Sequence, residues 1–265
     1  MRGLKGKVAI VTGGSRGIGR ACVQRLLEEE VSVLFCGRNE EVGKNTLKEL
    51  KEKFENVDFL AGNMIDPVFC KTLVAAAIEK FGRLDYLVNN AFPFTAKGVN
   101  ATREDWTYTM EAGPISYATM IQEFVRQRGK ENGSIVNMSS ISGHIAQPDR
   151  WTYNAAKGAV KQLTRCAALD LSPGIRVNCI SPGWVWTDEV KKAAPNGDEQ
   201  TAQDLWGDFH MIQRLERPEE IASATVFLLS DDASAVTAAD LFAEGGYLGL
   251  GPEGLGKDSA FAGSD

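Results

Sequence analysis

The sequence predicts an α/β fold in which one doubly wound parallel sheet carries helices on both faces. Short apolar stretches alternate with longer amphipathic stretches over the first third of the chain, as repeated strand–helix–strand units require. The first apolar stretch runs into a glycine-rich turn that opens a helix, which is typical of this class of fold. The 265 residues suffice for a well-buried core and contain no recognisable linker, so we expect residues 1–265 to form a single domain.

Composition excludes several classes of partner. The formal charge of −6 argues against nucleic acid or an anionic membrane as the main partner. No apolar run approaches the about 20 residues that a membrane helix needs, and the first apolar stretch is too short for a signal peptide. We therefore expect a cytoplasmic protein.

Neither cysteines nor histidines are arranged as metal ligands. The five cysteines, an odd number, show no zinc or redox spacing, and we expect free thiols in a reducing compartment. The chain has only two histidines, His144 and His210, and its other candidate ligands are not clustered. We therefore predict no metal site.

The first element in chain order is a short buried strand, Val8 to Thr12, followed by the segment TGGSRGIG and a helix. Gly13 allows the tight turn, Gly17 allows backbone to approach a pyrophosphate, and Gly19 lets the helix pack on the sheet. The phosphates would meet the free amides at the start of the helix. The alternative is a purely structural turn. The residues predicted here to bind a dinucleotide are Gly13, Ser15, Arg16, Gly17, Ile18 and Gly19.

The second strand, VSVLFC, ends in Gly37-Arg38-Asn39. An acidic residue at this place binds the adenosine ribose hydroxyls, whereas an arginine suits a 2′-phosphate. Arg38, with Arg16 in the glycine turn, therefore favours NADP(H) over NAD(H). Two alternatives stay open: both arginines are solvated surface residues, or the following glutamates, Glu40 and Glu41, compete with the phosphate.

The alternation of helix and strand continues. A polar helix from about Glu40 to Phe54 precedes the strand VDFLAG, and Asp66-Pro67 starts a helix to Phe81, before the strand LDYLVNNA. In such a sheet, ligands bind at the carboxyl ends of the strands. We expect Asn63, Met64 and Asn90 at these ends, near adenine and ribose. Hydrogen bonds from the asparagines to loop backbone are the alternative.

The next strand, SIVNMS, leads to Ser140, and a helical stretch then carries Tyr153 and Lys157. A spacing of four residues places Tyr153 and Lys157 on the same face of a helix. A phenol has a pKa of about 10, and an adjacent ammonium stabilises its phenolate. If the chain turns back, the Ser140 hydroxyl can hold a substrate oxygen beside the phenol. The alternative is a surface pair that happens to have helical spacing.

Taken together, these segments resemble the short-chain dehydrogenase/reductase family in its classical form. The resemblance covers the chain from Lys7 to about Gly246 and rests on five features. These are TGGSRGIG, the NNA at Asn89 to Ala91, Ser140, Tyr153 with Lys157, and SPGWVWT at Ser181 to Thr187.

The resemblance implies a role for each matching residue. The tyrosine at Tyr153 would be the general acid or base, and the lysine at Lys157 would lower its pKa and bind the nicotinamide ribose. Ser140 would polarise the reacting carbonyl. In the segment that begins with Pro182 and Gly183, the backbone of Val185 would contact the nicotinamide carboxamide, and the hydroxyl of Thr187 would contact the carboxamide or pyrophosphate. All four of these residues are thus predicted to bind the cofactor.

Three positions depart from the family pattern. Seven residues after Trp106 the family usually carries an asparagine that holds a proton-relay water, but this chain has Gly113 followed by Pro114. The proline should kink the helix. Either the kink frees a carbonyl for the relay water, or the site is weakened. Phe92 replaces a glycine after NNA, and Glu244 replaces an aspartate.

The substrate region is the least defined. The residues expected to line it are Phe92 (with Phe94), His144, Gln147, Trp151, Trp184 and Trp186. Their aromatic character suggests an apolar or ring-containing carbonyl substrate, although each tryptophan has packing as its alternative role. The variable segment 188–213 is also expected to line this region, and we expect its acidic part, around Asp198, Glu199 and Asp204, to form helices over the cleft and to move as a lid. The glycine-rich tail, 247–265, either packs on a neighbouring subunit or is mobile.

Three functions are compatible with these features. The first is an NADP(H)-dependent oxidoreductase that interconverts a small-molecule carbonyl and alcohol. The second uses the cofactor for epimerisation, dehydration or enoyl reduction, and the third is non-catalytic nucleotide binding, supported only by Gly113. The resemblance also implies a homodimer or homotetramer built through two long helices, expected at Glu104 to Arg128 and Trp151 to Leu171.

Overall fold

The computed structural model describes residues 1–129, 131–252, 254 and 255. Within them, seven strands form one sheet in the order β3-β2-β1-β4-β5-β6-β7, and every neighbouring pair is parallel. The strands are β1 (Val8–Val11), β2 (Ser32–Gly37), β3 (Val57–Ala61), β4 (Tyr86–Asn89), β5 (Gly133–Met138), β6 (Ile175–Pro182) and β7 (Asp240–Ala243). The strand order reverses between β1 and β4, which is where a doubly wound sheet opens a crevice.

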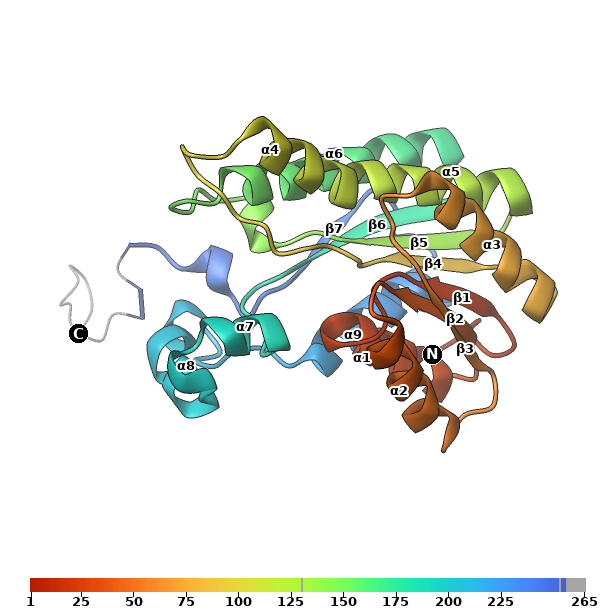
Figure 1. Ribbon diagram of the computed structural model, residues 1–265, viewed down its shortest axis with the longest axis horizontal. Coiled ribbons are helices and arrows are strands. Elements are labelled where there is room, and N and C mark those ends of the chain that lie inside the picture. The colour runs from red at the N-terminus through yellow and green to blue at the C-terminus, as the bar shows by residue number, and fades with distance from the viewer. Residues whose placement is uncertain (130, 253, 256–265) are drawn as a thin grey trace.

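Helices cover both faces of the sheet (Figure 1), so the predicted fold class is confirmed. One face is covered by α3 (Pro67–Phe81), α5 (Ser116–Arg128) and α6 (Trp151–Leu171), and the other by α1 (Gly17–Glu28), α2 (Glu40–Lys51) and α9 (Pro218–Leu229). Three further helices are α4 (Arg103–Met110), α7 (Asp188–Ala193) and α8 (Glu199–Trp206). The variable segment 188–213 thus contains the expected helices, α7 and α8.

The core consists of two apolar layers separated by the sheet. Ala9 and Val11 of β1 belong to the layer under α1 and α9, whereas Val8 and Ile10 belong to the layer under α3 and α5. This division follows from the alternation of side chains along a strand. Because both faces of the strands are buried, the strands read as continuous apolar runs in the sequence.

The long helix expected at Glu104 to Arg128 is interrupted where the sequence predicts a kink. A π-helical turn, Glu111–Ile115, separates α4 from α5, and Gly113 within it has non-helical angles (φ −108°, ψ −107°). Pro114 has no amide hydrogen to donate, so the regular hydrogen-bond ladder cannot continue through it. In contrast, α6 spans Trp151–Leu171 without interruption, as expected.

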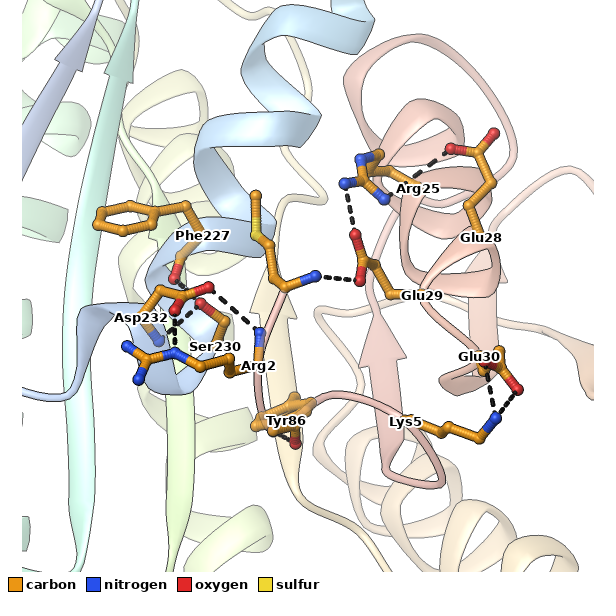
Figure 2. Close-up of polar contacts among 12 residues, drawn as sticks. Arg2, Lys5, Arg25, Glu28, Glu29, Glu30, Tyr86, Phe227, Ser230 and Asp232 are labelled. Carbon is orange, nitrogen blue, oxygen red and sulfur yellow. Dashed lines mark hydrogen bonds and ion pairs between the residues drawn. The ribbon is translucent and has the colours of Figure 1, made fainter.

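The amino-terminal segment is tied down beside α1 and after α9, as Figure 2 shows. Arg2 pairs with Asp232, and Lys5 pairs with Glu30 at 2.7 Å. The Tyr86 hydroxyl donates to the carbonyl of Gly3 at 3.0 Å. The last of these contacts involves the start of β4, at the opposite end of that strand from the crevice.

None of the helices in the described part of the chain combines the length and apolarity that crossing a bilayer requires. Past β7, a 3-10 turn at Tyr247–Gly249 begins the glycine-rich tail. Residues 253 and 256–265 of that tail lie outside the described residues. Most of the segment to which the expectation about the tail applies therefore lies outside them too.

Candidate active site

A cavity of about 1010 Å³ lies at the carboxyl ends of the strands and extends over the crevice between β1 and β4. Segments from distant parts of the chain line it: the glycine turn, the ends of β2 to β6, the first two turns of α6, and α7. All sixteen residues predicted to bind the cofactor line this cavity, as does Ser140. The site is therefore assembled by the sheet topology, because parallel strands end at one edge.

The glycine turn has the backbone geometry that its residues predict. Gly13 and Gly17 have positive φ angles of 67° and 54°, a conformation that other residues rarely adopt. A Cβ atom at Gly19 would overlap the carbonyl oxygen of Gly13. The first turn of α1 can consequently lie close to the strand, with its free amides facing the cavity.

The turn also contains an unsatisfied polar group. The hydroxyl of Ser15 is buried and has no hydrogen-bond partner within the described residues. Buried hydroxyls are almost always paired, so this one fits a ligand oxygen such as a phosphate. Arg16, which immediately precedes α1, lines the cavity beside it. The turn thus offers the donors and the space that a dinucleotide pyrophosphate needs.

Arg38 lies at the end of the cavity formed by β2. Its guanidinium donates to the hydroxyl of Tyr108 at 2.8 Å, and both residues line the cavity. The competing glutamates do not: neither Glu40 nor Glu41 is in the lining, and Glu40 pairs with Lys44 at 2.7 Å. Among the described residues, the cavity lining at this strand end thus contains Arg38 and neither of the two glutamates.

Asn90 joins the ends of β1 and β4 by hydrogen bonds at the crevice. Its side-chain amide donates to the carbonyls of Thr12 and Gly13, at 3.0 and 3.2 Å, and its backbone amide donates to the Thr12 hydroxyl. Asn63 similarly accepts from the backbone of Ile65 at 3.3 Å. Both asparagines thus hydrogen-bond loop backbone, the alternative role, while also lining the cavity.

Ser140 follows β5, and α6 brings Tyr153 and Lys157 to the same wall. Burial raises the pKa of the Tyr153 phenol, while a hydrogen bond with Ser140 and the charge of Arg150 act to lower it. Ser140 also accepts from the amide of Ser142 at 3.2 Å, which fixes its side chain at the start of a short 3-10 turn. The phenol and the hydroxyl therefore act on the same point of the cavity.

Lys157 differs from its expected arrangement. Its ammonium donates to the carbonyl of Met138 at 2.9 Å and lies 4.1 Å from the centre of the Phe92 ring. The side chain is 3% exposed, and burial lowers its pKa to about 7. The groups that act to lower the Tyr153 pKa here are Ser140 and Arg150, whereas the Lys157 ammonium donates to Met138 and lies over the Phe92 ring.

Phe92 fills the space where the absent asparagine side chain would lie. A Cβ atom at Gly113 would overlap the Phe92 ring, which also contacts Tyr153 edge-on with 5.4 Å between ring centres. Within the kink, the Ser116 hydroxyl lies 3.0 Å from both the Ala112 and Gly113 carbonyl oxygens, so these two carbonyls already have a donor within the protein. An aromatic ring thus occupies the predicted position of the relay.

The segment after β6 forms the wall opposite the glycine turn. Pro182, Gly183, Val185 and Thr187 all line the cavity, and Thr187 lies beside Gly17, where an added Cβ would meet its methyl group at 3.5 Å. A Cβ at Gly183 would lie 2.7 Å from the Glu216 carboxylate and 3.1 Å from the His210 ring, so a larger residue there would have to displace these side chains.

The structure divides the expected substrate residues into two groups. Phe92, Gln147 and Trp184 line the cavity, whereas His144, Trp151 and Trp186 do not. His144 instead lies 2.8 Å from both Asp240 and Lys161. Trp186 packs in a small apolar cluster, and Trp151 is 55% exposed. These three residues thus lie outside the cavity lining, and a contact between them and the substrate stays a prediction.

Comparison with known proteins agrees with this geometry. Residues 13–248 match a family model described as enoyl-(acyl carrier protein) reductase. The chain is 36% identical to L-fucose dehydrogenase of Mus musculus over 251 residues, which is 93% of this chain and 90% of the relative. The chain belongs to the short-chain dehydrogenase/reductase family.

Two further relatives are an alcohol dehydrogenase and a ketoreductase. An NADP-dependent (R)-specific alcohol dehydrogenase of Lentilactobacillus kefiri is 33% identical over 254 residues, 92% of this chain and 97% of that protein. A crystal structure of an actinorhodin polyketide ketoreductase variant with NADPH has a TM-score of 0.86 and 30% identity, and covers 93% of this chain and 99% of that one. The relatives are thus dehydrogenases and reductases of alcohols and carbonyls.

Sequence reasoning about this short-chain dehydrogenase/reductase missed two features of the site. Arg150 lines the cavity, and its place directly before the predicted helix, three residues before Tyr153 in the sequence, was the available signal. Glu216 and His210 form a buried pair, 3.5 Å apart, behind Gly183. No local pattern indicates that pair, because it depends on how the segment after β6 folds back.

Proposed function

We propose that this protein is an NADP(H)-dependent oxidoreductase. It transfers a hydride between the nicotinamide and a carbonyl or secondary alcohol of an apolar or ring-containing small molecule. The observation that carries this proposal is that Ser140, Tyr153 and Lys157 share one cavity with a glycine turn that suits a pyrophosphate. Family membership supports the same reaction class.

Three observations support NADP(H) as the cofactor. Arg16 and Arg38 both line the nucleotide end of the cavity, and the adjacent glutamates do not. The orphaned hydroxyl of Ser15 fits a phosphate oxygen. One relative is NADP-dependent, and one solved relative contains NADPH. When bound, the cofactor supplies or accepts the hydride.

The side chains of the chain itself handle the proton. In the reducing direction, the Tyr153 hydroxyl protonates the carbonyl oxygen, and the Ser140 hydroxyl donates a hydrogen bond to the same oxygen. The phenol is a weak acid while burial holds its pKa up, so nearby positive charge must stabilise the phenolate that forms. Arg150 already acts in this way, and Lys157 lies 5.6 Å from the phenol ring centre.

Reduction of a carbon–carbon double bond is a second candidate, because the matching family model is described as an enoyl reductase. The two reactions differ in the atom that receives the proton, which is oxygen for a ketone and carbon for an enoyl group. Parallel assays with a ketone and an α,β-unsaturated thioester distinguish them.

We further propose that the protein forms a homodimer or homotetramer. Apolar side chains are exposed on the helices that the resemblance assigns to subunit contacts, with Leu169 of α6 78% exposed and Ile115 53% exposed. Such side chains favour burial against another subunit. Light scattering after size-exclusion chromatography measures the assembly.

The test of the principal proposal is oxidation of NADPH, and separately of NADH, across a panel of aliphatic, aromatic, acyl and steroidal carbonyls. Turnover should prefer NADPH and be abolished in Tyr153→Phe, which cannot donate the proton. Unchanged turnover in Tyr153→Phe would refute the assigned mechanism. NADPH binding without turnover of any compound would favour the non-catalytic alternative.

A further inference from the structure

We propose that the substrate carries an anionic group, a carboxylate or a phosphate, and that Arg150 binds this group. The inference rests on the proposed oxidoreductase function and adds a substrate class to it. Its starting point is the charge of the cavity, which differs in sign from the charge of the whole chain.

Five basic and two acidic side chains line the cavity, although the chain carries a formal charge of −6. They are Arg16, Arg38, Arg150, Lys157 and Lys192, against Asp188 and Glu189. The two arginines at the nucleotide end suit cofactor phosphates, and Lys192 pairs with Glu189 at 2.6 Å. Arg150 remains, and within the described part of the chain it forms no ion pair with Asp188, Glu189 or any other acidic side chain.

Arg150 directly precedes α6, three residues before Tyr153. The Phe94 ring lies between the two, with its centre 5.0 Å from the Tyr153 ring centre and 5.3 Å from the guanidinium carbon of Arg150. The same guanidinium also lies 5.4 Å from the centre of the Trp184 ring. Arg150 therefore contacts two aromatic residues of the lining and lies one aromatic ring away from the proton donor.

The guanidinium of Arg150 has unused hydrogen-bonding capacity. Among the residues that the structure describes, it forms no ion pair and donates no hydrogen bond; its recorded contacts are the two rings. Arginine has five N–H donors in a plane, and stacking between rings leaves the edge of that plane available. Its charge nonetheless reaches the reaction centre, because it acts to lower the pKa of Tyr153.

This combination fits a particular kind of ligand. A carboxylate or phosphate can accept two parallel hydrogen bonds from the guanidinium edge and neutralise its charge. The rings of Phe94 and Trp184 suit an apolar or flat body between that anion and the reacting carbonyl. A neutral polyol can hydrogen-bond to arginine but leaves the charge in the cleft unbalanced.

The test uses three ketones that share one ring: 4-acetylbenzoate, 4-acetylphenyl phosphate and methyl 4-acetylbenzoate. We expect kcat/KM with NADPH to be about tenfold or more higher for an anionic ketone than for the neutral ester, as a charge-assisted hydrogen bond predicts. The carboxylate and phosphate arms identify which anion fits. Arg150→Gln should remove the preference mainly through KM, and Arg150→Lys should retain part of it. Arg165→Gln is the matched control, since it removes the same charge from the exposed side of α6.

Two results would overturn the inference. One is equal kcat/KM for the acids and the ester in the wild-type protein, and the other is an equal loss on all three ketones in Arg150→Gln, as a purely structural arginine would give. Calorimetric titration of benzoate and phenyl phosphate, with and without NADPH, needs no turnover. Anion binding that Arg150→Gln abolishes supports the site even if no ketone is reduced. Absence of such binding, or binding that survives the substitution, refutes the site whatever the fate of the proposed reaction.

Discussion

At the level of single residues, the two departures from the family pattern at Phe92 and Gly113 are structurally linked. The Phe92 ring lies in the space that a side chain at Gly113 would occupy. The same ring lies over the Lys157 ammonium and beside the Tyr153 ring. A cation held against an aromatic face is stabilised by about 0.5–2 kcal/mol, more when it is buried. The pair thus replaces a hydrated amide with an apolar contact.

A double-mutant cycle tests this pairing. Gly113→Asn alone should destabilise the protein by about 1–3 kcal/mol, because the new side chain overlaps the ring. Phe92→Gly alone should also destabilise it, by leaving a cavity beside Lys157. The double variant should be more stable than the two single losses predict, with a coupling of at least about 1 kcal/mol. Urea unfolding measures all four proteins, and strictly additive losses would contradict the pairing.

The chemistry of the catalytic residues was predictable from the sequence, but their contacts were not. Tyr153 and Lys157 follow from a spacing of four on one helix, and the glycine turn follows from its place between strand and helix. That Lys157 donates to Met138 and not toward Tyr153 depends on packing around it. The positions of His144 and Arg150 relative to the cavity depend on the path of the loop before α6, which no periodic pattern records.

At the scale of elements, the segment from β6 to α9 contains two buried polar side chains that lie side by side, Glu216 and His210. Glu216 is 3% exposed, and neither of its carboxylate oxygens has a hydrogen-bond partner within the described residues. Burial raises its pKa to about 7, and the charges of Glu244 and Glu220 act in the same direction, whereas Arg214 opposes them. The Nε2 atom of His210 accepts a hydrogen bond from the backbone amide of Trp184, which lines the cavity, so this bond connects the buried pair to the cavity wall.

Glu216 should make stability depend on pH. A carboxyl group whose pKa is raised in the folded state contributes stability below its unfolded value of 4.5, and that stability is lost as the pH rises through about 7. Wild-type protein should therefore lose about 2 kcal/mol relative to Glu216→Gln between pH 5 and 7.5. Urea unfolding at these pH values measures the difference. Glu219→Gln, on the exposed side of α9, is the control, and an identical pH profile for Glu216→Gln would contradict the prediction.

Element boundaries could be predicted where one periodicity dominates. α6 has its expected limits, and the kink before α5 follows from Pro114. β6 and α9 were not predicted. β6 contains Arg176 and Asn178, whose side chains bond to backbone between Leu228 and Ala239, so its polar residues are satisfied only by distant chain. A local reading cannot distinguish such a strand from a loop.

For the molecule as a whole, cofactor binding should raise the free energy of unfolding and therefore Tm. A ligand at about 100 times its dissociation constant stabilises the folded state by about 2.7 kcal/mol, which corresponds to about 5–10 °C in Tm for a chain of this size. NADPH should therefore raise Tm more than NADH at equal concentration. Arg38→Gln should narrow this difference, while Arg126→Gln, far from the cavity, should preserve it. Equal shifts from both cofactors in the wild-type protein would refute the NADP(H) preference.

The contact between Gly17 and Thr187 has a consequence for how the protein is made. These residues lie side by side in the cavity, although most of the chain separates them. During synthesis, the glycine turn emerges early, but its opposite wall appears only after β6 has joined the sheet. An incomplete chain therefore has no closed nucleotide site. We infer that the cofactor stabilises only chains in which β6 and the segment after it have folded, and that it does not stabilise earlier, partly folded forms.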